Sequence, residues 1–308
     1  MPPPAAGRPA DIVTASGAVE GYARFERFDV VGSTNDIVRG WLAAGEPEIC
    51  VAVADRQTAG RGRNGRTWSA PAGAALLMSL GFRPTWLDLD DAWRLAAVVA
   101  LAMADAAEDA AGLTEGAIRL KWPNDLVIVR AGSDALLVGD LSAAAAREQR
   151  SGPLDVRKIA GILGETDGLG TPDPRVIVGI GINADWATKD FPSELATSMS
   201  SLRDASGGRP IDREALLEGF LGRLETRVAA LRGGRFDVAT WTARQVTTGH
   251  LVSVVGLDGS VISARALGVD GASGALVVEV VDRDGGPEER HILAGEVGHL
   301  RLPSAGVV

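Results

Sequence analysis

Arginine and glycine alternate along residues 55–69, in a spacing that suits the binding of an anion. The alternating residues are Gly60, Arg61, Gly62, Arg63, Gly65 and Arg66. An arginine side chain offers a planar set of donors that matches carboxylate and phosphate oxygens. Glycine lets backbone N–H groups approach a ligand and lets the loop change shape when the ligand arrives. The segment therefore predicts a loop that closes over an anion, and the alternative interpretation is a solvated basic turn.

The glycine spacing of this loop also matches the fingerprint of dinucleotide-binding proteins, so the flanking sequence has to decide. That fingerprint requires a helix directly after the glycines, with the pyrophosphate at the helix N-terminus. Here Pro71 and Gly73 interrupt the chain, and residues 74–82 are an apolar run typical of a buried strand. The context excludes a dinucleotide fold, and the lack of a Gly-Lys-Ser/Thr sequence excludes a Walker loop.

A second polar group, Gly-Ser-Thr-Asn-Asp, lies where a predicted strand (22–31) meets a predicted helix that runs to about residue 44. Ser33 and Asp36 have the spacing of a capping box, with Asp in place of the usual Glu. One interpretation is a helix cap. The other is that Ser33, Thr34 and Asn35 present hydroxyl and amide groups to a polar ligand. The local sequence leaves both interpretations open.

Only three of the 31 basic residues are lysines, and two of these lie beside predicted strand ends. Lys121 opens the segment Lys-Trp-Pro-Asn-Asp, in which Pro123 fixes a turn, so Lys121, Asn124 and Asp125 project at the rim of a sheet. Lys158 begins another apolar run. A compact ammonium retained in such an arginine-rich chain indicates a site too small for a guanidinium.

The elements that position these residues are predicted from hydrophobic periodicity and turn signals. Strands outnumber helices up to residue 183, and one alanine-rich and one amphipathic stretch predict long helices. The predicted strands are 22–31, 49–54, 74–82, 117–120, 126–129, 158–165 and 175–183, and the predicted long helices are 88–111 and 212–231. Residues 1–20 predict a disordered tail, and residues 130–157 predict a mobile insertion that contains a short helix.

After residue 249 the pattern changes to short strands joined by turn sequences such as Asp-Gly. The predicted strands are 251–255, 261–267, 275–281, 291–293 and 297–302. This pattern predicts a small closed barrel. The three histidines of the chain, His250, His291 and His299, are too scattered within it to predict a metal site.

The composition is that of a globular protein, with 46% hydrophobic and 23% charged residues in a chain of 308. The net charge of −9 argues against a general nucleic-acid binder. No apolar run reaches eighteen residues and no secretory signal begins the chain, so a cytoplasmic enzyme without membrane association is expected. The single cysteine, Cys50, lies in an apolar run and predicts core packing.

Five motifs in this order resemble those of the biotin protein ligases, also called biotin–acetyl-CoA-carboxylase ligases. The motifs are Gly32–Asn35, Gln57–Trp68, Lys121–Asp125, Lys158–Leu163 and Gly179–Asn183. The resemblance implies an α+β fold with a mixed, mainly antiparallel sheet and helices, the class II synthetase-like catalytic fold of biotin and lipoate ligases, followed by a C-terminal SH3-like barrel. It implies a catalytic domain at 21–245 and a barrel domain at 246–303, which together cover nearly the whole chain.

The reaction implied by this resemblance has two steps and consumes ATP. Biotin's carboxylate attacks the α-phosphate of ATP to form biotinyl-adenylate, with pyrophosphate leaving, and a lysine of a biotin carboxyl carrier domain then takes the biotinyl group as an amide. ATP and biotin are the substrates, and Mg²⁺ is expected on the ATP phosphates with Asn124 or Asp125 near it. Because the carboxylate and the phosphate repel each other, cations must hold both.

The resemblance also assigns roles to individual residues. Arg63 and Lys158 would bridge the carboxylate and the α-phosphate, and Asp125 would orient Lys158 or the acceptor amine, which makes these three the expected catalytic residues. The expected biotin-binding residues are Ser33, Thr34, Asn35, Gln57, Gly60, Arg61, Gly62, Arg63, Lys158 and Gly161. The expected ATP- and adenylate-binding residues are Arg63, Arg66, Trp68, Lys121, Asn124, Lys158 and Asn183, with Trp68 stacked on adenine. The arginine loop should order over the mixed anhydride and exclude water.

Two features depart from the family pattern. Some members carry an N-terminal winged-helix domain and repress biotin genes, whereas about twenty residues precede the first predicted strand here, so a ligase without repressor activity is expected. The predicted insertion widens the spacing between Asp125 and Lys158. The alternatives are a lipoate or octanoate ligase or transferase of the same fold, and a non-enzymatic biotin-sensing module, which the acidic charge disfavours. A monomer or weak homodimer is expected.

Overall fold

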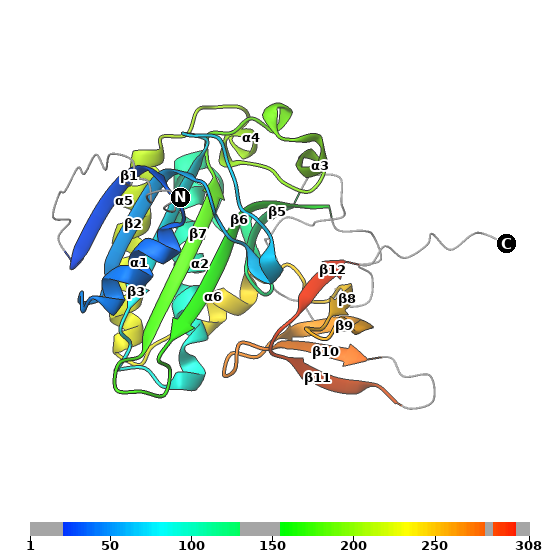
Figure 1. Ribbon diagram of the computed structural model, residues 1–308. Coiled ribbons are helices and arrows are strands. Elements are labelled where there is room, and N and C mark those ends of the chain that lie inside the picture. Colours follow the sequence, from blue (N-terminus) through cyan, green and yellow to red (C-terminus); the bar gives the residue numbers. More distant parts are fainter. Residues whose placement is uncertain (1–20, 130–154, 281–285, 300–308) are drawn as a thin grey trace, which may run out of the picture. The chain divides into compact units, whose positions relative to one another are not determined.

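The computed structural model describes three segments of the chain, residues 21–129, 155–280 and 286–299 (Figure 1). The chain divides into two compact units. The first comprises Met1–Thr85 and Leu163–Ile182, and the second comprises Trp86–Ile162 and Asn183–Val308. The predicted boundary between a catalytic and a barrel domain at 245/246 is a different division and stays a prediction.

Two predicted segments fall partly or wholly outside the described residues. The predicted tail, 1–20, lies outside them, and so does most of the predicted insertion. The end of that insertion is described, and there the prediction is wrong because Val156 and Arg157 already belong to a strand.

The first unit pairs a helix with the strands that flank it in sequence. Its elements are β1 (Arg24–Val31), α1 (Thr34–Ala43), β2 (Cys50–Gln57), β3 (Ala75–Phe82) and most of β7 (Arg175–Asn183). β1 and β2 run parallel, and β2 and β3 antiparallel. The apolar face of α1 packs on this sheet through Val38 and Leu42, which are fully buried against Phe28 and Cys50. Burial raises the pKa of the Cys50 thiol to about 11, as expected for a core cysteine.

The second unit begins with two long helices that lie side by side, α2 (Trp93–Ala111) and α5 (Arg213–Arg232) (Figure 1). Asp212 caps α5 by accepting hydrogen bonds from the backbone N–H groups of Glu214 and Ala215. The apolar positions of α5 are buried as the sequence predicts. The shorter helices are α3 (Ser193–Ala196), α4 (Leu202–Ala205) and α6 (Val238–Ala243). The strands β4 (Ile118–Lys121), β5 (Asp125–Val129) and β6 (Val156–Asp167) pair antiparallel, and β6 belongs to the second unit only as far as Ile162, since its remainder is part of the first.

The C-terminal part of the second unit is an all-antiparallel sheet. Its strands are β8 (Leu251–Val255), β9 (Val261–Val269), β10 (Leu276–Val280), β11 (Glu288–Ile292) and β12 (Glu296–His299). They follow the order β11-β10-β9-β8-β12, and the larger sheet follows the order β1-β2-β3-β7-β6-β5-β4. The expected combination of a mixed, mainly antiparallel sheet with helices and a second small sheet is therefore confirmed.

Most predicted elements are present, and the errors lie at their ends. The helix predicted at 88–111 begins at Trp93, because Leu89–Asp91 form a separate 3-10 turn. The strand predicted at 291–293 is Glu288–Ile292, and the strand predicted at 158–165 extends over Val156–Asp167. Turns and strand ends depend on backbone pairing that is set by neighbouring strands, which is why periodicity alone misplaces them.

Candidate functional site

The arginine loop is folded back on itself as a small hairpin. The N–H of Gly62 donates to the carbonyl of Arg66 at 2.7 Å, and the N–H of Trp68 donates to the carbonyl of Gly60 at 2.9 Å. A Cβ at residue 60 would lie 2.3 Å from the carbonyl oxygen of Trp68, so only glycine fits there. At the tip, Asn64 adopts a left-handed conformation with φ 54°. The glycines therefore serve the hairpin itself as well as any ligand.

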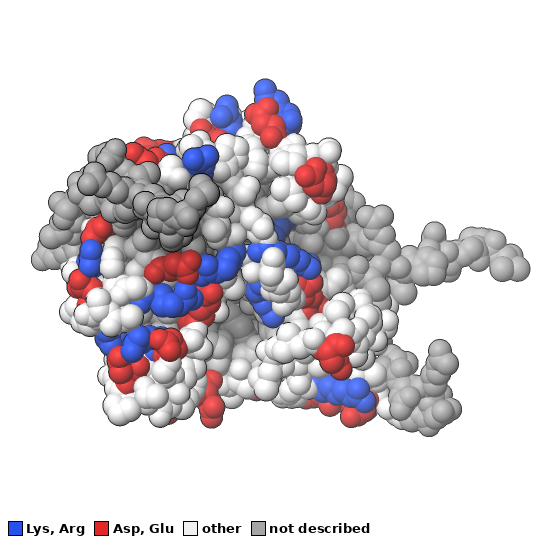
Figure 2. Space-filling model, viewed as in Figure 1, with Lys and Arg blue, Asp and Glu red and all other residues white. Residues whose placement is uncertain are grey.

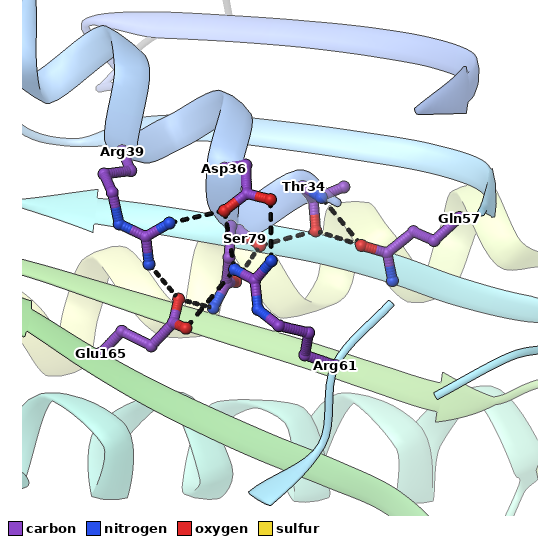
Figure 3. A network of polar contacts seen from close by, with 8 residues as sticks. Thr34, Asp36, Arg39, Gln57, Arg61, Ser79 and Glu165 are labelled. Atoms are coloured by element: carbon purple, nitrogen blue, oxygen red, sulfur yellow. Dashed lines mark hydrogen bonds and ion pairs between the residues drawn. The ribbon is translucent and has the colours of Figure 1, made fainter. Parts of the chain in front are cut away.

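Eight side chains from α1, β2, β3, β6 and the arginine loop form one connected polar network (Figure 3). Its members are Thr34, Asn35, Asp36, Arg39, Gln57, Arg61, Ser79 and Glu165. Gln57 Oε1 accepts hydrogen bonds from the backbone N–H of Thr34 at 2.8 Å and from its hydroxyl at 3.1 Å. The first turn of α1 is thereby tied to the end of β2.

The charged members of the polar network neutralise one another. Arg61 donates to both oxygens of Asp36 at 2.7 Å and lies 3.4 Å from Glu165. Arg39 contacts Asp36 at 2.5 Å and Glu165 at 2.6 Å. The hydrogen bonds from Arg61 hold the pKa of Asp36 below its usual range, and the same pairing raises the pKa of Arg61. Accordingly, Figure 2 shows acidic and basic side chains mixed over α1, with no single positive surface there.

Two polar groups beside this network have no hydrogen-bond partner in the described part of the chain. Ser33 is buried, and its hydroxyl does not cap α1, although its backbone is extended as at a helix N-cap. The amide nitrogen of Gln57 is likewise unpartnered, whereas its oxygen is used by Thr34. Of the two interpretations left open for the Ser-Thr-Asn segment, the side chain of Ser33 supports a ligand contact over a cap.

Glycines on β7 leave room for two of the predicted site residues. A Cβ at Gly179 would lie 2.3 Å from Asn35 Oδ1, and a Cβ at Gly181 would lie 2.5 Å from Trp68 Nε1. The Gly-Ile-Gly-Ile repeat thus provides space for a buried amide and an indole ring. The third polar residue of this segment, Asn183, is buried and donates to the carbonyl of Ser200 at 2.9 Å.

A lysine cluster, defined by Lys121, Asp125, Lys158 and Glu296, lies in the second unit. Lys158 Nζ and Asp125 Oδ1 are 2.6 Å apart. Lys121 is half-buried, and its ammonium makes no hydrogen bond or ion pair with any other described residue. Burial lowers the pKa of Lys121, and the charge of Lys158 lowers it further, while Asp125 and Glu296 partly offset these effects. An unpaired cation beside a paired one is an arrangement suited to receive an anion.

Asn124, in the turn before β5, and Gly161, on β6, lie next to the lysine cluster. Asn124 Nδ2 donates to the carbonyl of Ile162 at 2.8 Å, and Gly161 is the register partner of Asp125 across β5 and β6. Asp125 thus faces a strand position without a side chain, beside the ammonium of Lys158. The structure therefore brings together Lys121 at the end of β4, Asn124 and Asp125 where β5 begins, and Lys158 on β6.

Several residues that shape the site were missed by sequence reasoning. Arg39, Ser79 and Glu165 belong to the polar network but lie outside the motifs or look like ordinary exposed or strand positions. Trp122, inside a motif, is buried among Val252, Leu276 and other core residues of the C-terminal sheet and donates its indole N–H to Gly274 at 3.0 Å. Its bulky side chain between polar neighbours was the available signal for an anchoring role.

Two properties of the described residues bear on the chemistry of the site. No group of three or more His, Cys, Asp or Glu side chains within them is arranged to hold a metal ion. Among the helices in the described ranges, none is long and apolar enough to span a membrane.

Comparisons with known proteins agree with this architecture. The chain matches the Biotin/lipoate A/B protein ligase family over residues 28–183. The biotin–[acetyl-CoA-carboxylase] ligase of Mycobacterium tuberculosis is 29% identical over 287 residues, which cover 92% of each chain. The bifunctional ligase/repressor BirA of Bacillus subtilis is 32% identical over 253 residues, covering 82% of this chain and 68% of that one. A solved biotin protein ligase from Aquifex aeolicus, in complex with biotin and ATP, has a similar fold, with a TM-score of 0.66 and 23% identity over 91% of this chain and all of that one.

Proposed function

Because the chain belongs to the Biotin/lipoate A/B protein ligase family, we propose that it ligates biotin to a lysine of a biotin carboxyl carrier domain at the expense of ATP. In the first step an oxygen of biotin's carboxylate bonds to the α-phosphorus and pyrophosphate leaves. In the second, the acceptor amine bonds to the acyl carbon, AMP leaves and the amine loses a proton. The Mycobacterium tuberculosis relative, which is named as a biotin ligase, favours biotin over lipoate as the substrate.

The ureido ring of biotin is an uncharged group with one carbonyl acceptor and two N–H donors. The hydroxyl of Ser33 and the amide nitrogen of Gln57 supply matching unpartnered groups, while Thr34 holds Gln57 in place. The observation that carries the proposal is this pair of polar groups at the base of the arginine loop, which have no hydrogen-bond partner among the described residues, in a chain that matches the ligase family over residues 28–183.

The phosphate chemistry is assigned to the cations. Lys158, oriented by Asp125 at 2.6 Å, and Arg63 neutralise the carboxylate and the α-phosphate as they approach each other. Lys121, whose ammonium is paired with no described residue, offers it to a phosphate oxygen. Arg66 binds phosphate and Trp68 stacks on adenine, with Asn183 near the adenylate. These roles stay proposals.

Mg²⁺ would neutralise the triphosphate charge when bound with ATP. The amide oxygen of Asn124 and the carboxylate of Asp125 are of the oxygen type that Mg²⁺ takes. The carboxylate of Asp125 is already paired with Lys158, which fits an ion carried mainly by the phosphates. We place the enzyme in the cytoplasm, with the carrier domain of a biotin-dependent carboxylase as its partner.

The test is to incubate the protein with ATP, Mg²⁺ and either biotin or lipoate, and to measure pyrophosphate release and the mass of a carrier domain. Biotin-dependent pyrophosphate release, with a gain of one biotinyl group on the carrier, is expected. The control is a carrier whose acceptor lysine is replaced by arginine, which should leave the first step intact and abolish the second. Release with lipoate but not biotin would contradict the proposal.

A further inference from the structure

Glu165 lies on β6 beyond the Lys-Ile-Ala-Gly-Ile-Leu motif and contacts three residues of the polar network. One oxygen, Oε2, accepts from Asn35 Nδ2 at 2.6 Å and from Arg39 at 2.6 Å, and the other, Oε1, lies 3.4 Å from Arg61 (Figure 3). Its side chain is only 25% exposed. A single carboxylate therefore links the first turn of α1 to the base of the arginine loop.

Asn35 is held from three sides, which limits what its amide does. Its nitrogen donates to Glu165, its oxygen accepts from the Ser79 hydroxyl at 2.5 Å, and Gly179 provides the space that the amide fills. The residue is 4% exposed. An amide with both ends bonded within the protein is suited to fixing the backbone of its neighbours. Those neighbours are Ser33, whose hydroxyl is assigned to biotin, and Thr34, which holds Gln57 in place.

We propose that Glu165 is a positioning residue that sets Ser33 and Thr34 in place through Asn35 and at the same time latches the arginine loop through Arg61. Asn35 then acts as a positioning residue as well. The proposal rests on the assignment of biotin to this part of the molecule. It follows from the geometry because the charges of Arg39 and Arg61 are already matched by Asp36 and Glu165, so neither carboxylate is left to bind a cation.

Two substitutions separate the two roles of Glu165. Glu165→Gln keeps an acceptor for Asn35 but removes the charge that attracts Arg61, whereas Glu165→Ala removes both. The matched control is Asp167→Asn, on the same face of the same strand, whose carboxylate pairs with Arg175 at 3.0 Å outside the network. The Asp167→Asn variant loses the same negative charge at a position two residues from Glu165.

The measurements are the KM values for biotin and ATP in pyrophosphate release, and hydrogen exchange at residues 33–36 and 60–62. For Glu165→Ala we expect the biotin KM to rise about tenfold, as for loss of a charge-assisted hydrogen bond, with the ATP KM unchanged. Exchange should increase in both segments. For Glu165→Gln we expect a rise of about threefold or less in the biotin KM, with faster exchange at 60–62.

A biotin KM and exchange pattern in Glu165→Ala that match those of Asp167→Asn would overturn the positioning role. So would equal rises in both KM values, because that outcome indicates a general structural defect. The exchange comparison is made without substrates and so stands by itself. Failure of the wild-type protein to release pyrophosphate with biotin would contradict the proposed function, while the exchange data would still decide whether Glu165 holds the two segments.

Discussion

The polar network and the lysine cluster differ in whether their cations are paired with carboxylates. In the polar network Arg61 is paired with Asp36 and Glu165, and its pKa is raised. In the lysine cluster Lys121 has no ion-pair partner among the described residues, and its pKa is lowered. Both residues belong to motifs, and sequence reasoning assigned both to ligands.

The polar network is therefore arranged before any ligand binds, whereas the lysine cluster has a positive charge that no described residue matches. A paired arginine contributes to the shape of the site, because removing Arg61 would leave Arg39 alone to match the carboxylates of Asp36 and Glu165. A half-buried lysine without a partner costs stability until an anion arrives, which is an arrangement common at sites of chemistry. The network thus suits the uncharged ring of biotin, and the cluster suits phosphate.

The largest expected effect is at Arg63, the arginine assigned to both anionic groups. Arg63→Ala should lower the rate of adenylate formation about a hundredfold or more, because one donor to the developing charge is lost. It should also release biotinyl-adenylate into solution. The rate of adenylate formation measures the first effect. Retention of biotinyl-adenylate with the protein on a filter measures the second. If the variant formed biotinyl-adenylate at the wild-type rate and retained it fully, Arg63 would not hold the anionic groups. Its role would then be structural, like that of Arg61.

Lys158→Arg should be impaired about fiftyfold even though the charge is kept. A guanidinium is wider than an ammonium and planar, and a displacement of about 1 Å costs up to about a hundredfold. It would also disturb the 2.6 Å contact with Asp125. Lys189→Arg, at an exposed position, is the control and should leave turnover unchanged. Near-normal adenylate formation by Lys158→Arg at saturating ATP and biotin would reduce Lys158 to electrostatic background.

Lys121→Met should have effects of opposite sign on activity and stability. We expect the KM for ATP to rise about tenfold, because a charge-assisted contact to phosphate is lost, and the free energy of unfolding to increase. The folded pKa of Lys121 lies below the ordinary lysine value of 10.5, so the charged form costs stability at neutral pH. That cost fades as pH rises above the folded pKa and is gone above 10.5.

Denaturant unfolding at pH 7 and pH 10 checks the prediction for Lys121. The stability gain of Lys121→Met over the wild type should be larger at pH 7 than at pH 10. Lys189→Met, which changes an exposed lysine, should alter neither stability nor the KM for ATP. A loss of stability at pH 7 in Lys121→Met would mean that the ammonium is already well paired.

The smallest expected effect is a change, on ligand binding, in how well the arginine loop is protected from hydrogen exchange. Residues 63–66 should exchange more slowly with biotin and ATP than without, because glycine-rich backbone loses entropy as it closes on the adenylate. The Arg61 end should change less, since Asp36 and Glu165 already hold it. Equal protection of 63–66 with and without ligands would count against a closing loop.

The sequence by itself determined most of the elements and the positions of the polar motifs between them. The apolar face of α5, the cap at Asp212, the strand before the arginine loop and the turn at Pro123 all follow from patterns spanning a few residues. The motifs placed Ser33, Gln57, Lys121 and Lys158 at strand ends because such signals are local. Periodicity also distinguished the long helices from the short strands of the C-terminal sheet.

Only the tertiary structure decided which polar groups are already used and which remain for a ligand. Glu165 meets Asn35 across 130 positions of sequence, and Trp122 reaches the carbonyl of Gly274 across 152. No local pattern marks such pairs, because hydrogen bonds and ion pairs depend on the register of strands that the chain brings together from distant segments. Arg61 and Lys121 look alike in sequence, and their surroundings in the fold give one a pair of carboxylates and leave the other without a partner among the described residues.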